Sequence, residues 1–396
     1  MLQTLADIPN SRARQQELQY RLQHLEREAI IQLLCLALDD PYPPLRHDVA
    51  EGFQVLLGRG EGPAQPLDDE ITGYLEAIAI NQRPEHEITR KLNVPRELLP
   101  EDSLRARITA CVALEASPNP KQTVEVIRPL LHEESADLRY QALIAMNRLV
   151  PNTQLLHDVV VDALDDGDPE IVVVATQIAV MHGWADLVSR FLHARARLRG
   201  EDRTQITFSV GELIDNSELT PSDLPAEARG DMIAECVDAL RHEPHTAAAI
   251  KTLANLEARE AIGELVQVTK RWFAHPILKV EAAAALVDLD NPAGEKYLEK
   301  ALHSRRKDSR GYALRVVGER KLSRYFSHLV DVATSNDYHA DTAALALADY
   351  GGDEARAILN ELGDSHPNTE VRRLATRALT KGLALDPRSF DATLDR

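Results

Sequence analysis

Apolar residues recur at helical spacing along this chain, and the pattern itself repeats. In the C-terminal third, an anchor residue is followed four positions later by an apolar residue, and by another one turn further on, as in a helix with one buried face. Successive anchors are 31 residues apart, or 32 in the first step, and they are Thr246, Leu278, Ser309, Ala340 and Val371. Each anchor follows a turn rich in Asp, Pro, Asn, Ser and His, which suit helix N-caps and first turns. The pattern therefore predicts repeated pairs of antiparallel helices.

Looser copies of the same unit precede these repeats. Their anchors are Leu45, Leu104, Leu138 and Ile171, and the last three are 34 and 33 residues apart. No period-2 alternation of useful length is present, so strands are not expected. Because such a helix pair buries its apolar face only by stacking on the next pair, we expect an all-α fold, an α-solenoid (superhelix) of about nine or ten antiparallel helix pairs.

The repeats divide the chain into five expected parts. Residues 1–58 would hold an N-terminal capping helix and the first repeat, and residues 59–100 an irregular insertion with an extra helix. The looser middle repeats, one of them degenerate, would occupy 101–245, the regular 31-residue repeats 246–383, and a tail 384–396. Within the first part, the polar-rich stretch from Asn10 to Leu38 is predicted to be one long helix, capped by Asn10 or Ser11.

These units resemble the HEAT-repeat family. With the pattern LxxLxxxxAxxxLxxL, the C-terminal units are similar to the short HEAT-like repeats of the phycobilin-lyase type. The resemblance covers about residues 30–383 and is strongest over 246–383. It implies an α-solenoid and, for most such proteins, a scaffold that binds other proteins, although a few are enzymes.

One enzyme class with this architecture, similar to deoxyhypusine hydroxylase, holds two irons with His-Glu dipeptides on its inner helices. An oxygen-activating iron needs several His and carboxylate ligands around one point. Here the dipeptides that begin at His132 and His242 fall in turns between helices, and only His47-Asp48 has a comparable inner position. A metal site would therefore lack most of its ligands.

Two other enzyme classes built from such repeats are weighed in the same way. A HEAT-like alkylpurine DNA glycosylase needs a basic concave surface with aromatic groups, whereas this chain is acidic and its tryptophans, Trp184 and Trp272, are expected to pack in the core. The phycobilin lyases leave no short diagnostic motif to match. Phosphate-loop and nucleophile-elbow motifs are absent from the sequence. We therefore expect no enzyme, no cofactor and no metal, with an enzyme or enzyme subunit of chromophore-lyase type as the alternative and a DNA glycosylase less favoured.

Composition and charge narrow the classes of partner. The 396 residues include 45 basic and 63 acidic side chains, a net charge of −18 with His neutral, which argues against a general binder of nucleic acid or anionic membranes. The N-terminus lacks a basic region followed by an apolar one, and no stretch is long and apolar enough to span a membrane, so a cytoplasmic location is expected. Cys35, Cys111 and Cys236 lie far apart in apolar helical patterns, and we expect them to be buried.

One segment departs from the acidic average. Residues 303–324 hold eight basic residues against Asp308 and Glu319, a net of +6. They would occupy the turn before one inner helix, that helix, and the turn after it, so both edges of one repeat would be basic. We predict a docking surface for an acidic or phosphorylated protein segment, with pairing to acidic neighbours as the alternative. The eight candidates are Arg305, Arg306, Lys307, Arg310, Arg315, Arg320, Lys321 and Arg324.

An arginine also recurs at or just after five anchors, and stacked repeats would align these side chains in a row. They are Arg46, Arg105, Arg139, Arg310 and Arg372. Because the guanidinium fork pairs with carboxylates and carbonyls, we expect each arginine to bond the acidic turn of a neighbouring repeat, as in the Asp/Arg ladder of HEAT proteins. Contact with a partner is the alternative.

The function that these observations predict is that of a non-enzymatic scaffold or adaptor. It would dock partner proteins on its concave or edge surface, for the assembly, regulation or localisation of a complex. Neither nucleic acid nor a membrane is expected among its partners.

Overall fold

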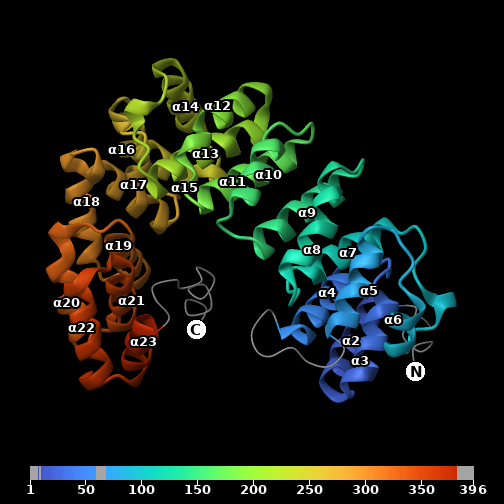
Figure 1. Ribbon diagram of the computed structural model, residues 1–396. Coiled ribbons are helices and arrows are strands. Elements are labelled where there is room, and N and C mark those ends of the chain that lie inside the picture. Colours follow the sequence, from blue (N-terminus) through green and yellow to red (C-terminus); the bar gives the residue numbers. More distant parts are fainter. Residues whose placement is uncertain (1–7, 9, 59–67, 381–396) are drawn as a thin grey trace. The chain divides into compact units, whose positions relative to one another are not determined.

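The structure is a computed structural model that describes residues 8, 10–58 and 68–380 (Figure 1). Within these residues it contains 22 α-helices, six short 3-10 helices and no β-strand. The predicted all-α fold, with antiparallel helices stacked in pairs as an α-solenoid, is confirmed. No helix of the described part is long and apolar enough to cross a membrane. The predicted tail, 384–396, and the start of the predicted insertion, 59–67, lie outside the described residues.

Two compact units divide the chain, Met1–Ser209 and Val210–Arg396, and the division falls within helix α13 (Gly200–Asn216). The other described α-helices of the first unit are α2 (Ser11–His24), α3 (Arg27–Ala37), α4 (Pro43–Leu56), α5 (Asp68–Ala79), α6 (His86–Lys91), α7 (Leu104–Leu114), α8 (Pro120–Ile127), α9 (Ala136–Leu149), α10 (Gln154–Ala163), α11 (Pro169–Met181) and α12 (Val188–Arg197).

The second unit continues from α13 with the regular repeats. Its α-helices are α14 (Ala226–Ala239), α15 (Glu243–Asn255), α16 (Ile262–Lys270), α17 (Pro276–Asp288), α18 (Pro292–Leu302), α19 (Lys307–Glu319), α20 (Phe326–Thr334), α21 (Ala340–Tyr350), α22 (Gly352–Ser365) and α23 (Thr369–Thr380). Here the odd-numbered helices from α15 to α23 form one layer, in which each contacts the next, and the even-numbered helices form the other (Figure 1). We call these the inner and outer helices.

Small residues let the inner helices of the second unit pack closely. Four consecutive alanines in α17, Ala282 to Ala285, are fully buried. Four consecutive residues point around the whole circumference of a helix, and α17 contacts α15, α16, α18 and α19. Alanine is therefore the side chain that fits a helix with neighbours on every side, and it also has the highest helix propensity.

Each inner helix from α15 to α21 is followed by a residue with left-handed backbone conformation. These residues are Glu257 (φ 49°), Asp290 (φ 58°) and Lys321 (φ 50°), and after α21 two glycines with positive φ, Gly351 (70°) and Gly352 (83°), take this place. After α19, the amide of Leu322 donates to the carbonyl of Val317 at 3.0 Å, which satisfies one of the last carbonyls of the helix. The left-handed residue turns the chain back, so that the next outer helix starts within a few residues.

The N-terminal stretch forms two helices, and the prediction of a single long helix is wrong. Helices α2 and α3 are separated by Leu25 and Glu26, both extended, with ψ of 153° and 152°. Asn10 caps α2 as predicted, since its side chain accepts the amides of Arg12 and Ala13 at 3.0 and 3.2 Å. Both helices contact α4, whose 14 residues span only about 21 Å. A straight helix of twice that length would run past α4, and the break allows both halves to pack on it.

The three cysteines are buried and form no disulfide, as predicted. Burial raises the pKa of the Cys111 thiol to about 12, although Arg107 opposes that rise. Burial also raises the pKa of the Cys35 thiol. Both thiols therefore stay protonated at neutral pH and serve as small apolar side chains of the core.

Candidate protein-binding edge

Turns between each outer helix and the inner helix that follows it lie on one edge of the second unit. We call this the turn edge, and it comprises residues 240–242, 271–275, 303–307, 335–339 and 366–368. Contacts connect each turn with the next repeat: Arg271 with the Leu240 carbonyl (2.6 Å), the His275 ring with the Tyr312 ring (centres 5.6 Å apart), Lys307 with the Tyr338 ring (3.7 Å), and the His366 imidazole with the Ser335 carbonyl (3.2 Å). The turn edge is therefore a continuous surface.

The turn between α18 and α19, together with the first residue of α19, carries three of the predicted cations. Arg305 and Arg306 are exposed, and neither side chain has an ion-pair partner in the described part of the chain. The ammonium of Lys307 lies 3.7 Å from the centre of the Tyr338 ring, which is within cation–π range. Asp308, the acid that follows, is exposed as well. This cationic turn presents two guanidinium groups to solvent.

The remaining five predicted cations lie elsewhere in the repeat, and four of them form ion pairs. The pairs are Arg310 with Asp337 (2.9 Å), Arg315 with Glu319 (2.6 Å), Arg320 with Asp288 (2.7 Å), and Arg324 with Glu295. The fifth, Lys321, is exposed at the far end of α19, about 20 Å along the helix from the cationic turn. The structure thus brings Arg305, Arg306 and Lys307 together and leaves the other basic edge largely neutralised.

Two exposed aromatic residues occupy the turn between α16 and α17. Trp272 is 85% exposed and Phe273 is 92% exposed. The prediction that Trp272 packs in the core is wrong, because α16 ends at Lys270 and the backbone of Arg271 (φ −57°, ψ 122°) is no longer helical, so Trp272 lies beyond the buried face of the helix. Trp184, by contrast, is half-buried. Sequence reasoning did not single out Phe273 at all.

An open groove of about 450 Å³ lies between this turn and the turn that precedes α15. Trp272, Phe273 and Leu278 supply its apolar wall, and Arg241 and Arg271 flank it. The Arg271 guanidinium is held by the Leu240 carbonyl at 2.6 Å, and Arg241 pairs loosely with Asp238 at 3.4 Å. The groove therefore combines a large apolar surface with nearby positive charge.

The five recurrent arginines all bond residues of turns. Its members bond as follows: Arg46 with the Asp40 carbonyl (2.6 Å), Arg105 with Asp39 (3.0 Å), Arg139 with Asp166 (2.8 and 2.9 Å), Arg310 with Asp337 (2.9 Å), and Arg372 with the His366 carbonyl (2.5 Å). Arg105, Arg139 and Arg310 reach an acid in a neighbouring repeat, as predicted. Arg46 and Arg372 differ from the prediction, since each bonds a carbonyl of the turn just before its own helix.

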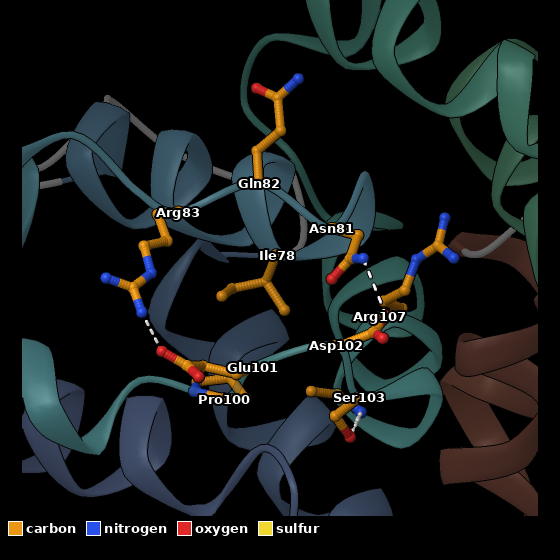
Figure 2. Close-up of a pocket in the computed structure, with 10 residues that line it drawn as sticks. Ile78, Asn81, Gln82, Arg83, Pro100, Glu101, Asp102, Ser103 and Arg107 are labelled. Atoms are coloured by element: carbon orange, nitrogen blue, oxygen red, sulfur yellow. Dashed lines mark hydrogen bonds and ion pairs between the residues drawn. The ribbon is translucent and has the colours of Figure 1, made fainter.

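A polar pocket of about 290 Å³ in the first unit is a second candidate, and Figure 2 shows its lining. The Asn81 amide donates to Asp102 at 2.9 Å, and Arg83 pairs with Glu101. Asn81 and Asp102 both have left-handed backbone conformation, which Asn and Asp tolerate better than most residues. Because these side chains bond one another, we assign the pocket a structural role: it fastens the connection after α5 to the start of α7.

The His-Glu dipeptides lie at helix ends and turns. His132 ends the 3-10 helix Arg128–His132, and His242 is the N-cap residue of α15. Among the residues that the structure describes, no group of three or more His, Cys, Asp or Glu side chains is placed to hold a metal ion.

Comparison with known proteins supports the fold of this chain and gives no more specific identification. No protein-family model matches this sequence, and no curated protein matches it. Among solved structures, importin beta is 13% identical, with a TM-score of 0.50 over 96% of this chain and 62% of that one. A mutant of Kap121p is 13% identical, with a TM-score of 0.41 over 95% of this chain and 44% of that one. An engineered protein is 18% identical, with a TM-score of 0.38 over 88% and 98%.

The likeness to importin beta, together with the stacked helix pairs, defines this chain as an all-α, HEAT-like α-solenoid. The chain spans about three fifths of the importin beta chain that it matches. The phycobilin-lyase type of repeat, suggested by the 31-residue spacing, stays a prediction.

Proposed function

We propose that this protein is a non-enzymatic scaffold or adaptor, which docks partner proteins along the turn edge for the assembly, regulation or localisation of a complex. The observation that carries the proposal is the exposed pair Trp272 and Phe273 beside a cationic turn. Contiguous exposed apolar surface of this kind marks interaction sites on soluble proteins.

The magnitude of the exposed surface supports a protein partner. Each aromatic side chain buries about 150 Å² or more when covered, so the pair offers about 300 Å², or roughly 7 kcal/mol before the costs of association. Tryptophan and arginine are also the residues most enriched in interface hot spots. A partner that covers the pair therefore gains an anchor, and the nearby arginines add orientation.

The charge of the chain favours proteins over polyanions. Proteins that bind nucleic acids gain most of their affinity by neutralising many phosphates with lysine and arginine. Four turn-edge cations have no ion-pair partner among the described residues; Arg271 bonds the Leu240 carbonyl and Lys307 contacts the Tyr338 ring, which leaves Arg305 and Arg306 as the two exposed guanidinium groups, and the whole chain has a net charge of −18. Two cations suit a short acidic stretch of protein better than an extended polyanion.

Site-specific photo-cross-linking tests this proposal. A photoreactive phenylalanine analogue replaces Phe273 on the turn edge in one protein, and exposed Ser323, in the turn between α19 and α20, in a control protein. We expect the Phe273 position to cross-link one discrete protein in the native cell extract, and the Ser323 position to cross-link none. The captured protein is identified by mass spectrometry and rebound in purified form.

Two results would overturn the proposal. The first is capture of the same proteins from both positions, which would indicate non-specific collision. The second is a native protein that migrates at its monomer mass in extract and yields no cross-link from Phe273.

A further inference from the structure

We infer that the turn edge binds an extended acidic protein segment with an apolar residue at each end. The inference rests on the proposed function and names the chemistry of the partner. It comes from the order of side chains along the edge: an aromatic turn at Trp272 and Phe273, the cationic turn at Arg305 and Arg306, and a second aromatic turn at Tyr338.

Tyr338 is held in place although it is 66% exposed. One face of its ring meets the Lys307 ammonium at 3.7 Å, and the His339 ring stands at 89° to it, with ring centres 5.0 Å apart. Arg310 adds a bond to Asp337 of the same turn at 2.9 Å. Tyr338 is thus a preorganised apolar contact, which lowers the entropy cost of binding against it.

The cationic turn is available for a partner because its charges are not already satisfied. Arg305 and Arg306 have no ion-pair partner among the described residues, whereas Arg310, one turn along α19, is bonded to Asp337. A carboxylate that approaches this turn therefore displaces no acid of the protein. Arginine binds carboxylates with its planar fork, so each of the two side chains suits one aspartate or glutamate.

Repeat spacing sets the length of the segment. Neighbouring helices in contact lie about 8–10 Å apart, so the two steps from α17 to α21 separate the aromatic turns by roughly 16–20 Å. An extended chain rises about 3.3 Å per residue, so five or six residues, roughly, span that distance. The expected segment has two apolar side chains about six positions apart, with acidic residues between them.

Carboxylates fit this edge better than a phosphate group or a nucleic acid. Arg305 and Arg306 are adjacent residues of one turn, each with a guanidinium group of its own, so the edge suits separate single charges; Asp308 and Asp341 lie in the first turns of α19 and α21. A nucleic acid would bring phosphates against those acids as well, at a cost that grows with each contact.

Binding of labelled heptapeptides to the purified full chain tests the inference. The probe has Leu and Phe at its ends and five alternating aspartates and glutamates between them. Three control peptides serve as comparisons: one with Asn and Gln in place of the acids, one with the same composition but with Leu and Phe adjacent, and one neutral peptide with a single phosphoserine. A short oligothymidylate is the nucleic-acid probe. Fluorescence anisotropy at about 50 mM salt, where surface charges are weakly screened, measures each affinity.

Matched variants locate the site. We expect R305E/R306E to weaken binding of the acidic probe about tenfold or more, because both favourable charge pairs become repulsive. W272A/F273A should weaken binding of the same probe about tenfold or more, because the aromatic anchor is lost. K321E makes a single charge reversal of the same kind at the far end of α19 and should alter the affinity less than about twofold. All five substituted positions are exposed, and circular dichroism confirms that each variant is folded.

Four results would overturn the inference: equal binding of the amide peptide, equal binding of the peptide with adjacent apolar residues, tighter binding of the phosphopeptide or oligothymidylate, or equal losses in K321E and R305E/R306E. Absence of binding by every probe would also overturn it. If Phe273 still cross-links a partner in that case, the proposed function stands and only the chemistry of the partner is wrong.

Discussion

A Cβ atom on Gly318 would stand 2.2 Å from the carbonyl oxygen of Ala346, so α19 passes α21 at a distance that only glycine permits. We expect G318A to lower the free energy of unfolding by about 2–3 kcal/mol, since the two helices must move apart. Urea denaturation measures the change. In G263A, in α16, the new methyl group meets nothing within 4 Å, and a gain of about 0.5–1 kcal/mol is expected from helix propensity. A stable G318A protein would contradict the close approach.

The left-handed backbone at Lys321 (φ 50°) disfavours a residue with a Cβ atom. We expect K321G to raise the free energy of unfolding by about 1 kcal/mol, because glycine adopts this conformation without strain. Lys296 is an exposed lysine inside α18, and K296G should lower stability by about 1 kcal/mol. Thermal or urea unfolding separates the two signs. Destabilisation by both substitutions would show that the Lys321 side chain contributes contacts that outweigh the strain.

Arg139 connects two repeats of the first unit. Its guanidinium bonds both oxygens of Asp166, at 2.8 and 2.9 Å, and the Glu133 carbonyl at 2.8 Å. We expect R139A to lower the free energy of unfolding by about 1.5–3 kcal/mol. R139K should recover less than half of that loss, roughly, because a point charge cannot bond in the same fork. The exposed Arg128 supplies a control, and R128A should change stability by less than about 0.5 kcal/mol.

The same pair has a predictable pH dependence. Burial alone would raise the pKa of Asp166, but hydrogen bonds from Arg139 and from backbone amides lower it overall. A carboxylate with a lowered pKa stabilises the fold at neutral pH and loses that contribution as pH falls through the lowered value. The difference between the wild type and R139A should therefore shrink in strong acid. A difference that does not vary with pH would mean that the Arg139 stem, and not its charge, supplies the stability.

The pKa of Asp349, on α21, is shifted in the opposite direction. Burial, and then the neighbouring Glu319, raise the pKa of Asp349 from 3.8 to about 6, while Arg315 opposes the rise. The folded state thus holds a proton that the unfolded chain has released, so stability falls as pH rises from about 4 to about 6 and is constant above. We expect D349N to be more stable than the wild type at pH 7 by about 1 kcal/mol, a value reduced for partial exposure.

The pH profile of the difference is the decisive measurement. The advantage of D349N should vanish as pH falls toward about 4, where the carboxyl group is protonated in both states. D353N, at an exposed position of α22, should show no such profile. An equal gain for D349N at all pH values would indicate better packing and contradict the raised pKa.

Much of the fold was predictable because the signals are local. The anchors Thr246, Leu278, Ser309, Ala340 and Val371 all fall in the first turn of an inner helix. Turn residues and apolar spacing specify such a start within a few positions of the chain. The break at Leu25 was not predictable in this way. It depends on the length of α4, on which both halves pack, and no residue near Leu25 carries that information.

The candidate site was predictable only in part, because its charges depend on neighbouring repeats. Arg310 forms an ion pair with Asp337, and Arg320 with Asp288, and each acid is about one repeat away in the sequence. An acid about one repeat away in the sequence indicates a cation that is already paired in the fold. This signal could have reduced the set of eight candidate cations. The exposure of Trp272 also had a signal: Trp272 and Phe273 directly follow two basic residues and precede the helix-starting Pro276, as expected of a turn.

The left-handed residues after the inner helices affect how such a chain can gain or lose whole repeats. The left-handed backbone returns at Glu257, Asp290 and Lys321, so the segment between two of them leaves the stack in the direction in which it entered. Deleting or duplicating one such segment joins ends of matching geometry, and every other repeat keeps its neighbours on both sides. Gene-level loss or gain of a whole repeat is therefore structurally conservative, whereas an insertion of half a repeat would exchange inner and outer helices downstream.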